Sequence, residues 1–166
     1  MSNIRYDFGG AQCPYDDNII LVDNISDEDL SYLPLNEDGK RFKNKLIRQD
    51  IFEHFQLNEK ATFINVSSVI GYHIDAKWGW SSDKEINYEK IKILTNNIIN
   101  HLDTTKKCTV RLYDYMILLE GVIEILLDNH FTISTCNLVR YREIDCPAEW
   151  EVIMEKTWSN RLSFRG

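Results

Sequence analysis

Proline and glycine are scarce in this chain: only 3 of its 166 residues are proline and only 7 are glycine. No Gly/Ser-rich tract, low-complexity stretch or internal repeat separates one part of the sequence from another, which argues against flexible linkers and repeat architectures. The composition, 43% hydrophobic and 11% aromatic, is instead typical of a chain that buries a packed core. We therefore expect one globular domain over residues 1–166.

The sequence has no excess of basic residues, because 19 Lys and Arg stand against 26 Asp and Glu, for a formal net charge of -7. Binding to nucleic acid in general, or to an anionic membrane surface, needs clustered positive charge, so neither partner is expected. The longest apolar run, residues 115–127, contains two glutamates and is shorter than the roughly 20 residues that cross a bilayer. The first ten residues lack the apolar stretch of a secretory signal. We expect a soluble, cytoplasmic protein.

Cysteine occurs only 4 times, and the positions are Cys13, Cys108, Cys136 and Cys146. They show no C-x-x-C spacing and no neighbouring histidine, so zinc ligation and redox motifs have no support. The cysteines are expected to be reduced, with packing as their role. No residue pattern indicates a metal, a cofactor or a complete catalytic set, and the sequence predicts none of these.

The residue patterns that are present predict strands and helices in alternation. Runs rich in β-forming residues predict strands at residues 4–8, 18–23, 61–66, 108–113 and 131–141. Apolar residues at every third or fourth position predict helices at residues 41–57, 83–102 and 115–128, with a short helix between Ser26 and Leu33. A last helix is expected after Pro147, with one face lined by Trp150, Ile153, Met154 and Trp158.

Three N-caps and one crossover refine this outline. Ser26, Ser82 (in a capping box with Glu85) and Asp114 are the expected N-caps. Residues 108–141 form a strand, helix, strand unit, which predicts two parallel strands with a right-handed crossover. The fold class is therefore mixed α/β, a single domain in which a central mixed sheet of about five strands contains this βαβ unit and is packed with helices.

His130 and Thr132 are the most visible chemical motif. A His, an apolar residue and a Thr in this order are similar to the active-site strands of two-histidine phosphoesterases, each of which carries such a triplet. That resemblance implies acid and base catalysis by two histidines, but no other histidine in the sequence is followed by a hydroxyl residue at the same spacing. The alternative, that His130 ends a helix and Phe131 begins a buried strand, fits the flanking pattern better.

Residues 71–83 hold a second candidate, in which His73 and Asp75 lie among Tyr72, Trp78 and Trp80. A carboxylate beside an imidazole is an arrangement used in acid/base and metal chemistry, yet a nucleophile or third ligand at a recognisable spacing is missing. The aromatic residues serve equally well as core packing or as anchors at a protein interface.

Two charged clusters have simple structural interpretations. Glu120, Glu124 and Asp128 repeat at every fourth residue of a largely apolar helix, which predicts a narrow solvated stripe rather than a metal site. The basic residues of 39–48 lack the Gly-rich loop and GK[ST] of a phosphate cradle, so a solvated face is expected there as well.

Negative charge is concentrated in the first quarter of the chain. Through Lys40 the only basic residues are Arg5 and Lys40, whereas the acidic residues are Asp7, Asp16, Asp17, Asp23, Asp27, Glu28, Asp29, Glu37 and Asp38. This asymmetry predicts a directional field that speeds the capture of a basic partner.

The sequence therefore favours a non-enzymatic inhibitor, most concretely an immunity protein or antitoxin that blocks the active site of a basic toxin such as a nuclease. The binding residues expected for this role are Asp16, Asp17, Asp27, Glu28, Asp29, Tyr72, Trp78 and Trp80. A phosphoesterase-like enzyme that uses His130 and Thr132, and an adaptor subunit of a larger assembly, remain as alternatives.

Overall fold

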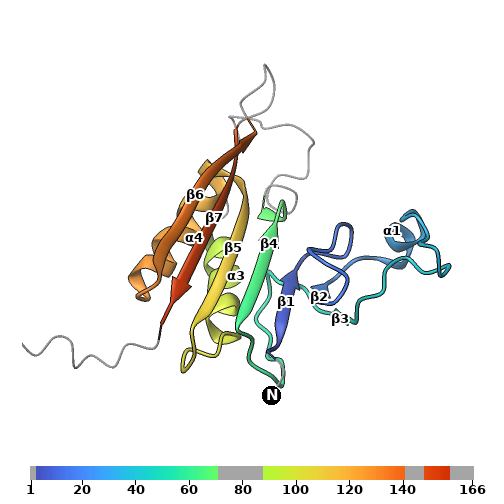
Figure 1. Cartoon of the computed structure of the whole chain (residues 1–166), viewed down its shortest axis with the longest axis horizontal. Coiled ribbons are helices and arrows are strands. Elements are labelled where there is room, and N and C mark those ends of the chain that lie inside the picture. Colours follow the sequence, from blue (N-terminus) through green and yellow to red (C-terminus); the bar gives the residue numbers. More distant parts are fainter. Residues whose placement is uncertain (1–2, 71–87, 141–147, 158–166) are drawn as a thin grey trace, which may run out of the picture.

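One mixed sheet organises the computed structural model, which describes residues 3–70, 88–140 and 148–157. Within these residues the sheet has 7 strands in the order β3-β2-β1-β4-β5-β7-β6 (Figure 1). The strands are β1 (Arg5–Phe8), β2 (Ile20–Asp23), β3 (Leu46–Arg48), β4 (Phe63–Ser67), β5 (Cys108–Tyr115), β6 (Thr132–Arg140) and β7 (Glu149–Lys156). The mixed α/β class is confirmed, with more strands than the sequence indicated.

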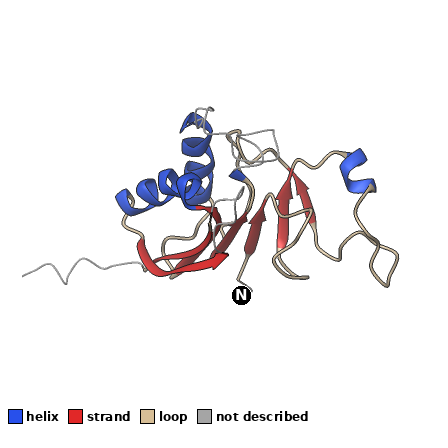
Figure 2. Cartoon of the chain, turned by 90° about the horizontal axis from the view of Figure 1, so that it is seen from above, coloured by secondary structure: helices blue, strands red, loops and turns tan. Residues whose placement is uncertain are grey.

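Strand direction changes only near one edge of the sheet. Strands β3, β2, β1, β4 and β5 run parallel, whereas β7 pairs antiparallel with both β5 and β6. The unit of residues 108–141 therefore has parallel outer strands, as expected, but β7 lies between them. Its helix α4 (Met116–Asp128) and helix α3 (Tyr88–Asn100) cover the same face of the sheet (Figure 2).

The main core lies between this face and the two helices. Alternate residues of β5, from Cys108 to Asp114, are buried beneath α3 and α4, and the apolar faces of both helices close over them. Leu94, Ile98 and Leu119 are fully buried. Periodicity placed these two helices correctly, because their packing against the sheet requires one continuous apolar side.

The links between the first four strands contain almost no helix. Residues 9–19 join β1 to β2, and residues 49–62 join β3 to β4, and neither link contains a helix. The remaining link holds the five-residue helix α1 (Asp27–Ser31), whose N-cap is Ser26 as expected. The side chain of Ser26 accepts a hydrogen bond from the Asp29 amide at 3.0 Å.

The helix predicted over residues 41–57 is wrong. This segment contains β3 and an irregular chain whose apolar residues, including Ile51 and Phe52, are nevertheless buried in the core. Side chains of α3 take the place of helical hydrogen bonds: Asn97 Nδ2 donates to the carbonyl oxygens of Ile51 and Glu53 at 3.0 and 2.8 Å. Tertiary contacts thus override the local periodicity.

The helix predicted after Pro147 is also wrong within the described residues, because residues 149–156 form β7. The sequence EWEVIMEK places Trp150, Val152 and Met154 at alternate positions, and Val152 and Met154 are buried beneath the helices. This alternation is the period of a strand, and it competes with the wider spacing from Trp150 to Trp158. Pro147 and Trp158 lie outside the described residues.

The end of α4 confirms that His130 ends a helix. The following strand is not buried as predicted, because Phe131 is buried but every residue of β6 is exposed. The His130 and Phe131 amides donate to the carbonyl oxygens of Leu127 and Leu126, and His130 has a φ of 69°. This is a Schellman ending with a non-glycine residue in the left-handed position. At the other end, Tyr115 is the N-cap and makes no side-chain capping bond, so the prediction of Asp114 as N-cap is wrong.

The predicted capping box of Ser82 and Glu85 lies outside the described residues.

Among the described helices, none combines the length and apolar character that crossing a membrane would require.

Candidate functional site at the carboxyl ends of the parallel strands

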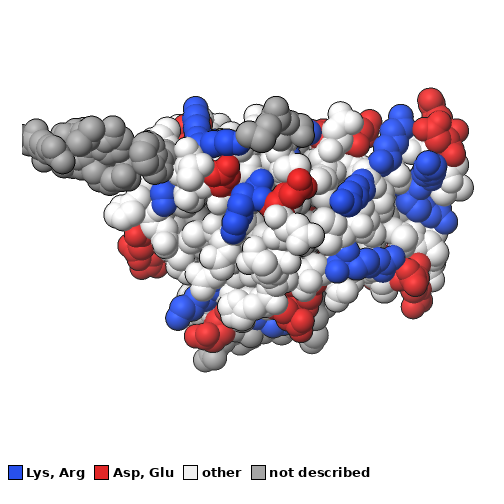
Figure 3. Space-filling view, turned by 90° about the horizontal axis from the view of Figure 1, so that it is seen from below, with Lys and Arg blue, Asp and Glu red and all other residues white. Residues whose placement is uncertain are grey.

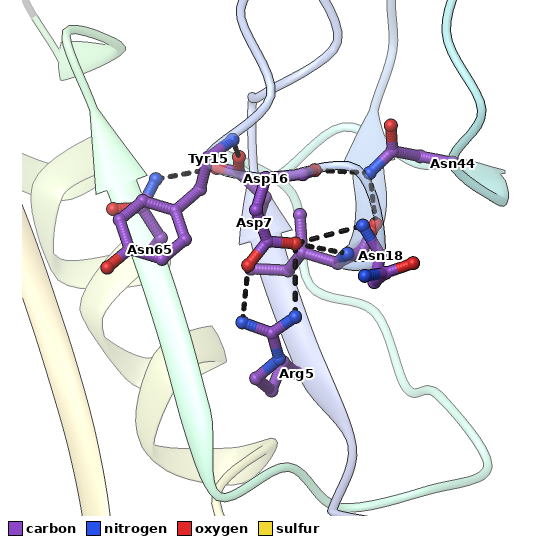
Figure 4. A network of polar contacts seen from close by, with 8 residues as sticks. Arg5, Asp7, Tyr15, Asp16, Asn18, Asn44 and Asn65 are labelled. Carbon is purple, nitrogen blue, oxygen red and sulfur yellow. Dashed lines mark hydrogen bonds and ion pairs between the residues drawn. The ribbon is translucent and has the colours of Figure 1, made fainter.

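A buried carboxylate lies at the centre of the sheet, where β1 ends. The Asp7 side chain is fully buried, and its two oxygens accept hydrogen bonds from Asn65 Nδ2 at 2.9 Å and from the Tyr15 amide at 2.8 Å (Figure 4). Burial raises the pKa of Asp7, and the bonds from Asn65 and Tyr15 oppose that rise. Asp7 thus fastens the loop of residues 9–19 to the sheet.

Two glycines follow directly, and the backbone requires both. Gly9 has a φ of +79°, a conformation that favours glycine, and its amide donates to the Val22 carbonyl at 2.8 Å. A Cβ on Gly10 would lie 2.2 Å from Cγ of Asp7. Gly9 and Gly10 therefore form a tight turn directly after β1, packed against the side chain of Asp7.

Asp23 marks the carboxyl end of β2 and joins this turn. Its Oδ2 accepts a hydrogen bond from the Ala11 amide at 2.9 Å, and the residue is only partly buried. A carboxylate at the end of the second strand can bind ribose hydroxyls, as an acidic residue does in dinucleotide-binding α/β sheets. The chemistry at this edge therefore fits a nucleoside ligand.

The chain leaves β4 beside the same turn. Ser68 has a φ of 54°, which is unusual for a residue other than glycine, and its amide donates to the Tyr113 carbonyl at 2.7 Å. The next residues, Val69 and Ile70, are buried, and the Ile70 amide donates to Oδ2 of Asp114 at 3.2 Å. Such strained positions are common at functional sites.

Strand order makes β1 and β4 the switch point of the sheet. The chain proceeds from β1 outward to β2 and β3, then returns to β4 on the other side of β1. In open parallel sheets, ligands bind outside the carboxyl ends of the strands at such a point. Asp7, Gly9, Asp23 and Ser68 all lie there, which makes this edge the candidate site.

A chain of polar contacts continues from Asp7 across the sheet face that α3 and α4 leave uncovered. Arg111 Nη1 donates to Oδ1 of Asn65 and to Oγ of Ser67 at 2.9 and 3.0 Å, and its Nε donates to Glu151 at 2.8 Å. Its guanidinium lies 5.2 Å from the ring centroid of Tyr15. This network holds the loop of residues 9–19 over the sheet.

Tyr113 extends the same face toward β7. Its hydroxyl donates to Oε2 of Glu149 at 2.6 Å, and desolvation together with this bond raises the pKa of Tyr113 to about 12. Tyr113 therefore stays protonated at neutral pH and acts as a hydrogen-bond donor.

Three of the nominated acidic residues have local roles. Asp16 pairs with Arg5 at 2.6 Å, and the hydrogen bond from Arg5 lowers its pKa. Asp27 pairs with Arg48 at 2.8 Å, and Asp29 takes part in the Ser26 cap. Strand β3 thus brings a basic segment beside the acidic first quarter. Figure 3 shows acidic and basic side chains interspersed on one side of the molecule.

The other nominated residues are scattered or lie outside the description. Asp17 and Glu28 are exposed, and their binding to a partner stays a prediction. Tyr72, Trp78 and Trp80, with His73 and Asp75, lie outside the described residues. His130 ends α4 and Thr132 begins β6, where Thr132 Oγ1 donates to the Glu155 carbonyl at 3.3 Å. Among the described residues, no cluster of three potential metal ligands occurs.

Known structures share this arrangement over nearly the whole chain. The N-methyltransferase NodS from Bradyrhizobium japonicum aligns with a TM-score of 0.64 at 14% identity, over 93% of this chain and 86% of that protein. A SAM-dependent methyltransferase from Methanosarcina mazei aligns with a TM-score of 0.62 at 8% identity, over 95% and 94%. This chain has the methyltransferase fold.

A TehB-like SAM-dependent methyltransferase from Corynebacterium glutamicum gives the same result, with a TM-score of 0.61 at 9% identity over 93% of this chain and 80% of that protein. No family model and no curated protein matches the sequence.

These neighbours contradict the hypothesis of an immunity protein or antitoxin. The solved structures that share this fold are methyltransferases, and several of the acidic residues of the first quarter form caps and ion pairs within the chain instead of a free acidic surface. The residues that sequence reasoning missed are Asp7, Gly9, Gly10 and Asp23. Their signal was available, because a glycine pair directly after one strand and a carboxylate ending the next are features of nucleotide-binding sheets.

Proposed function

We propose that this chain is a methyltransferase that binds S-adenosylmethionine at the switch point between β1 and β4. The observation that carries the proposal is the strand order, in which an antiparallel β7 lies between β5 and β6, as part of a fold shared with SAM-dependent methyltransferases over at least 93% of the chain. Because fold alone does not determine function, the residues at the site must support it.

Asp23 is the residue we assign to the ribose hydroxyls. Its carboxylate is held at the edge of the sheet by the Ala11 amide and remains partly exposed. The tight turn at Gly9 and Gly10 lets the backbone lie close to that edge without a side chain in the way. Residues 68–70, which leave β4 beside the turn, would form the opposite wall of the site.

The loop of residues 9–19 would give this site its rigidity. Asp7 holds the loop through the Tyr15 amide. Asn44, just before β3, holds it through Nδ2, which donates to the carbonyl oxygens of Asp16 and Ile19 at 2.8 and 2.7 Å (Figure 4). A loop that is already ordered before binding loses less conformational entropy when a ligand binds, which favours affinity. S-adenosylmethionine, when bound, would supply the methyl group for transfer to a nucleophile of the substrate.

A cytoplasmic location belongs to this proposal. The described cysteines Cys13, Cys108 and Cys136 are free thiols, which suits a reducing compartment.

Calorimetric titration of the purified full chain with S-adenosylmethionine tests the function. We expect saturable binding at one site, and a roughly tenfold or greater loss of affinity in Asp23→Asn, because a hydrogen bond to a charged group contributes about 1.5–3 kcal/mol. Asparagine retains an acceptor for the Ala11 amide, so the loop should keep its shape. Asp17→Asn, an exposed change of the same kind, is the matched control. Absence of binding to the wild type at millimolar ligand would overturn the proposal.

A further inference from the structure

An apolar groove of about 350 Å³ lies between α4 and the β6-β7 hairpin, far along the chain from the candidate site. Its wall is formed by Met116, Ile123 and Leu127 of α4. Its floor contains Ile133 and Cys136 of β6, together with Val152 of β7. Leu127 and Ile133 are each 45% exposed, so two large apolar side chains face solvent beside the groove. Exposed apolar patches of this kind often mark interaction sites.

Acidic side chains run along the wall of the same groove. Glu120, Glu124 and Asp128 line it at successive turns of α4, and all three are exposed. None of the ion pairs between described residues includes them. The stripe that sequence analysis interpreted as merely solvated therefore borders an apolar depression, and this combination fits a ligand that is both apolar and basic.

The chain itself leaves the sheet at one end of this groove. Lys156, the last residue of β7, donates from Nζ to the Asn129 carbonyl at 3.0 Å and lies 5.4 Å from the ring centroid of Phe131. These contacts fasten the end of β7 to the carboxyl end of α4, beside Leu127 and Asp128. The residues after Thr157 therefore start from the rim of the groove.

The sequence of residues 158–166, WSNRLSFRG, has the composition that the groove requires. It contains three large apolar side chains, Trp158, Leu162 and Phe164, two arginines, Arg161 and Arg165, and no acidic residue. Extended, these residues reach about 30 Å, whereas α4 is about 20 Å long. We propose that residues 158–166 dock in the groove of their own chain, with the apolar side chains on its floor and the arginines against the acidic residues of α4.

Docking in this way would cover the exposed apolar side chains of Leu127 and Ile133. Arginine suits the acidic wall because its guanidinium can bind carboxylates in a bidentate manner. Attachment to β7 makes the interaction intramolecular, so that modest contacts suffice to keep the segment bound. The proposal does not depend on the methyltransferase assignment.

Alkylation of Cys136 provides a direct test, because its exposed thiol lies in the groove. We expect Cys136 to react at least roughly tenfold faster in a chain that ends at residue 157 than in the full chain, a ratio that corresponds to about 1.4 kcal/mol of docking free energy. Cys13, exposed in the loop of residues 9–19, is the internal control and should react equally in both. Peptide mass spectrometry gives both rates.

Full-length variants separate docking from any general effect of truncation. Leu162→Asp with Phe164→Asp should raise the Cys136 rate as truncation does, and a synthetic peptide of residues 157–166 should restore protection to the truncated chain. The peptide with Arg161→Glu and Arg165→Glu should not. Equal Cys136 rates in the full and truncated chains would overturn the proposal. Protection that disappears on dilution would also overturn it, since the segment of a second copy would then be the occupant.

Discussion

The two halves of the sheet are held in different ways. Strands β4, β5, β7 and β6 carry α3 and α4, whose apolar faces bury the main core. Strands β1, β2 and β3 are joined by links with little helix. They contribute Tyr6, Phe8 and Val22 to the main core, and a smaller apolar cluster around Ile19, Leu21 and Ile25 packs beside them. The helix-covered half therefore depends mainly on apolar burial, whereas the helix-poor half, β1 to β3, depends in addition on polar side chains that hydrogen-bond to the backbone of its links.

Those polar side chains come from positions that sequence patterns do not mark. Asn44 holds the link between β1 and β2, and Asn97 and His101 hold the link between β3 and β4. His101 is fully buried, with Nδ1 2.7 Å from the Asn97 carbonyl and Nε2 accepting from the Leu57 amide at 2.9 Å. A parallel sheet can therefore keep its order without a helix in every crossover, if buried side chains form hydrogen bonds with the backbone groups of the links.

The largest loss of folding stability on mutation is expected in the helix-covered half. Leu119→Ala removes a side chain that is fully buried between α4 and the sheet, and we expect the free energy of unfolding to fall by about 2–5 kcal/mol. Ile117→Ala, on the same helix but 45% exposed, is the control and should cost far less. Urea denaturation measures both. Equal losses would show that α4 does not pack as described.

The second-largest loss of stability is expected where polar side chains hold the links of the helix-poor half. Asn97→Ala leaves the Ile51 and Glu53 carbonyl oxygens without their donor, and we expect a loss of about 1–3 kcal/mol. Hydrogen exchange should rise first in residues 49–57. Asn100→Ala, an exposed position at the end of α3, should leave exchange there unchanged. If exchange rose evenly over the protein, the two halves would not be distinct.

The buried His101, which holds a link of the helix-poor half, should make the free energy of unfolding depend on pH. Burial lowers the pKa of His101, while the bond to the Asn97 carbonyl opposes the change. The unfolded chain then binds a proton more readily than the folded chain, so the contribution of His101 is complete above the unfolded pKa of about 6.5 and is lost as the pH falls below it.

We therefore expect the wild type to lose more unfolding free energy between pH 7.5 and pH 5 than His101→Gln does. His54→Gln, at an exposed position in the same link, should follow the wild type. Urea midpoints at the two values provide the measurement. Parallel losses in the wild type and His101→Gln would contradict a buried neutral imidazole.

The smallest effect concerns α1, which lies at the outer end of the helix-poor half. Ser26→Ala removes the N-cap of a five-residue helix that buries no residue. We expect about 1 kcal/mol of local destabilisation, visible as faster amide exchange in residues 27–31 but with little change in the urea midpoint. Ser31→Ala should alter the exchange less. A large change in the global midpoint would indicate that α1 packs more tightly than described.

Sequence patterns predicted the helix-covered half better than the other half, for a physical reason. Helices α3 and α4 must present one apolar side to a sheet, so their periodicity is directly visible in the sequence. Residues 41–57 have the same periodicity, but residues 46–48 pair with β2, and backbone groups of Ile51, Glu53 and Leu57 bond to the side chains of Asn97 and His101, which lie far away in sequence. The signal for β7 was present in its alternation, yet a competing helical spacing concealed it.

The candidate site was only partly predictable. Strands at residues 4–8 and 18–23 and the breakers between them were recognised, but the meeting of Gly9, Asp23 and Ser68 at one edge depends on the strand order. Neither the return of the chain from β3 to β4 nor the left-handed conformation of Ser68 has a local sequence signal. The comparison with solved structures supplied what the sequence pattern could not.

Amide hydrogen exchange with and without S-adenosylmethionine tests the central claim, that a ligand binds where the helix-poor half meets the helix-covered half. The account predicts slower exchange in residues 9–24 and 67–70 when ligand is present, no change in α4 or β6, and loss of this protection in Asp23→Asn. Unchanged exchange at saturating ligand, or protection confined to α4 and β6, would contradict it.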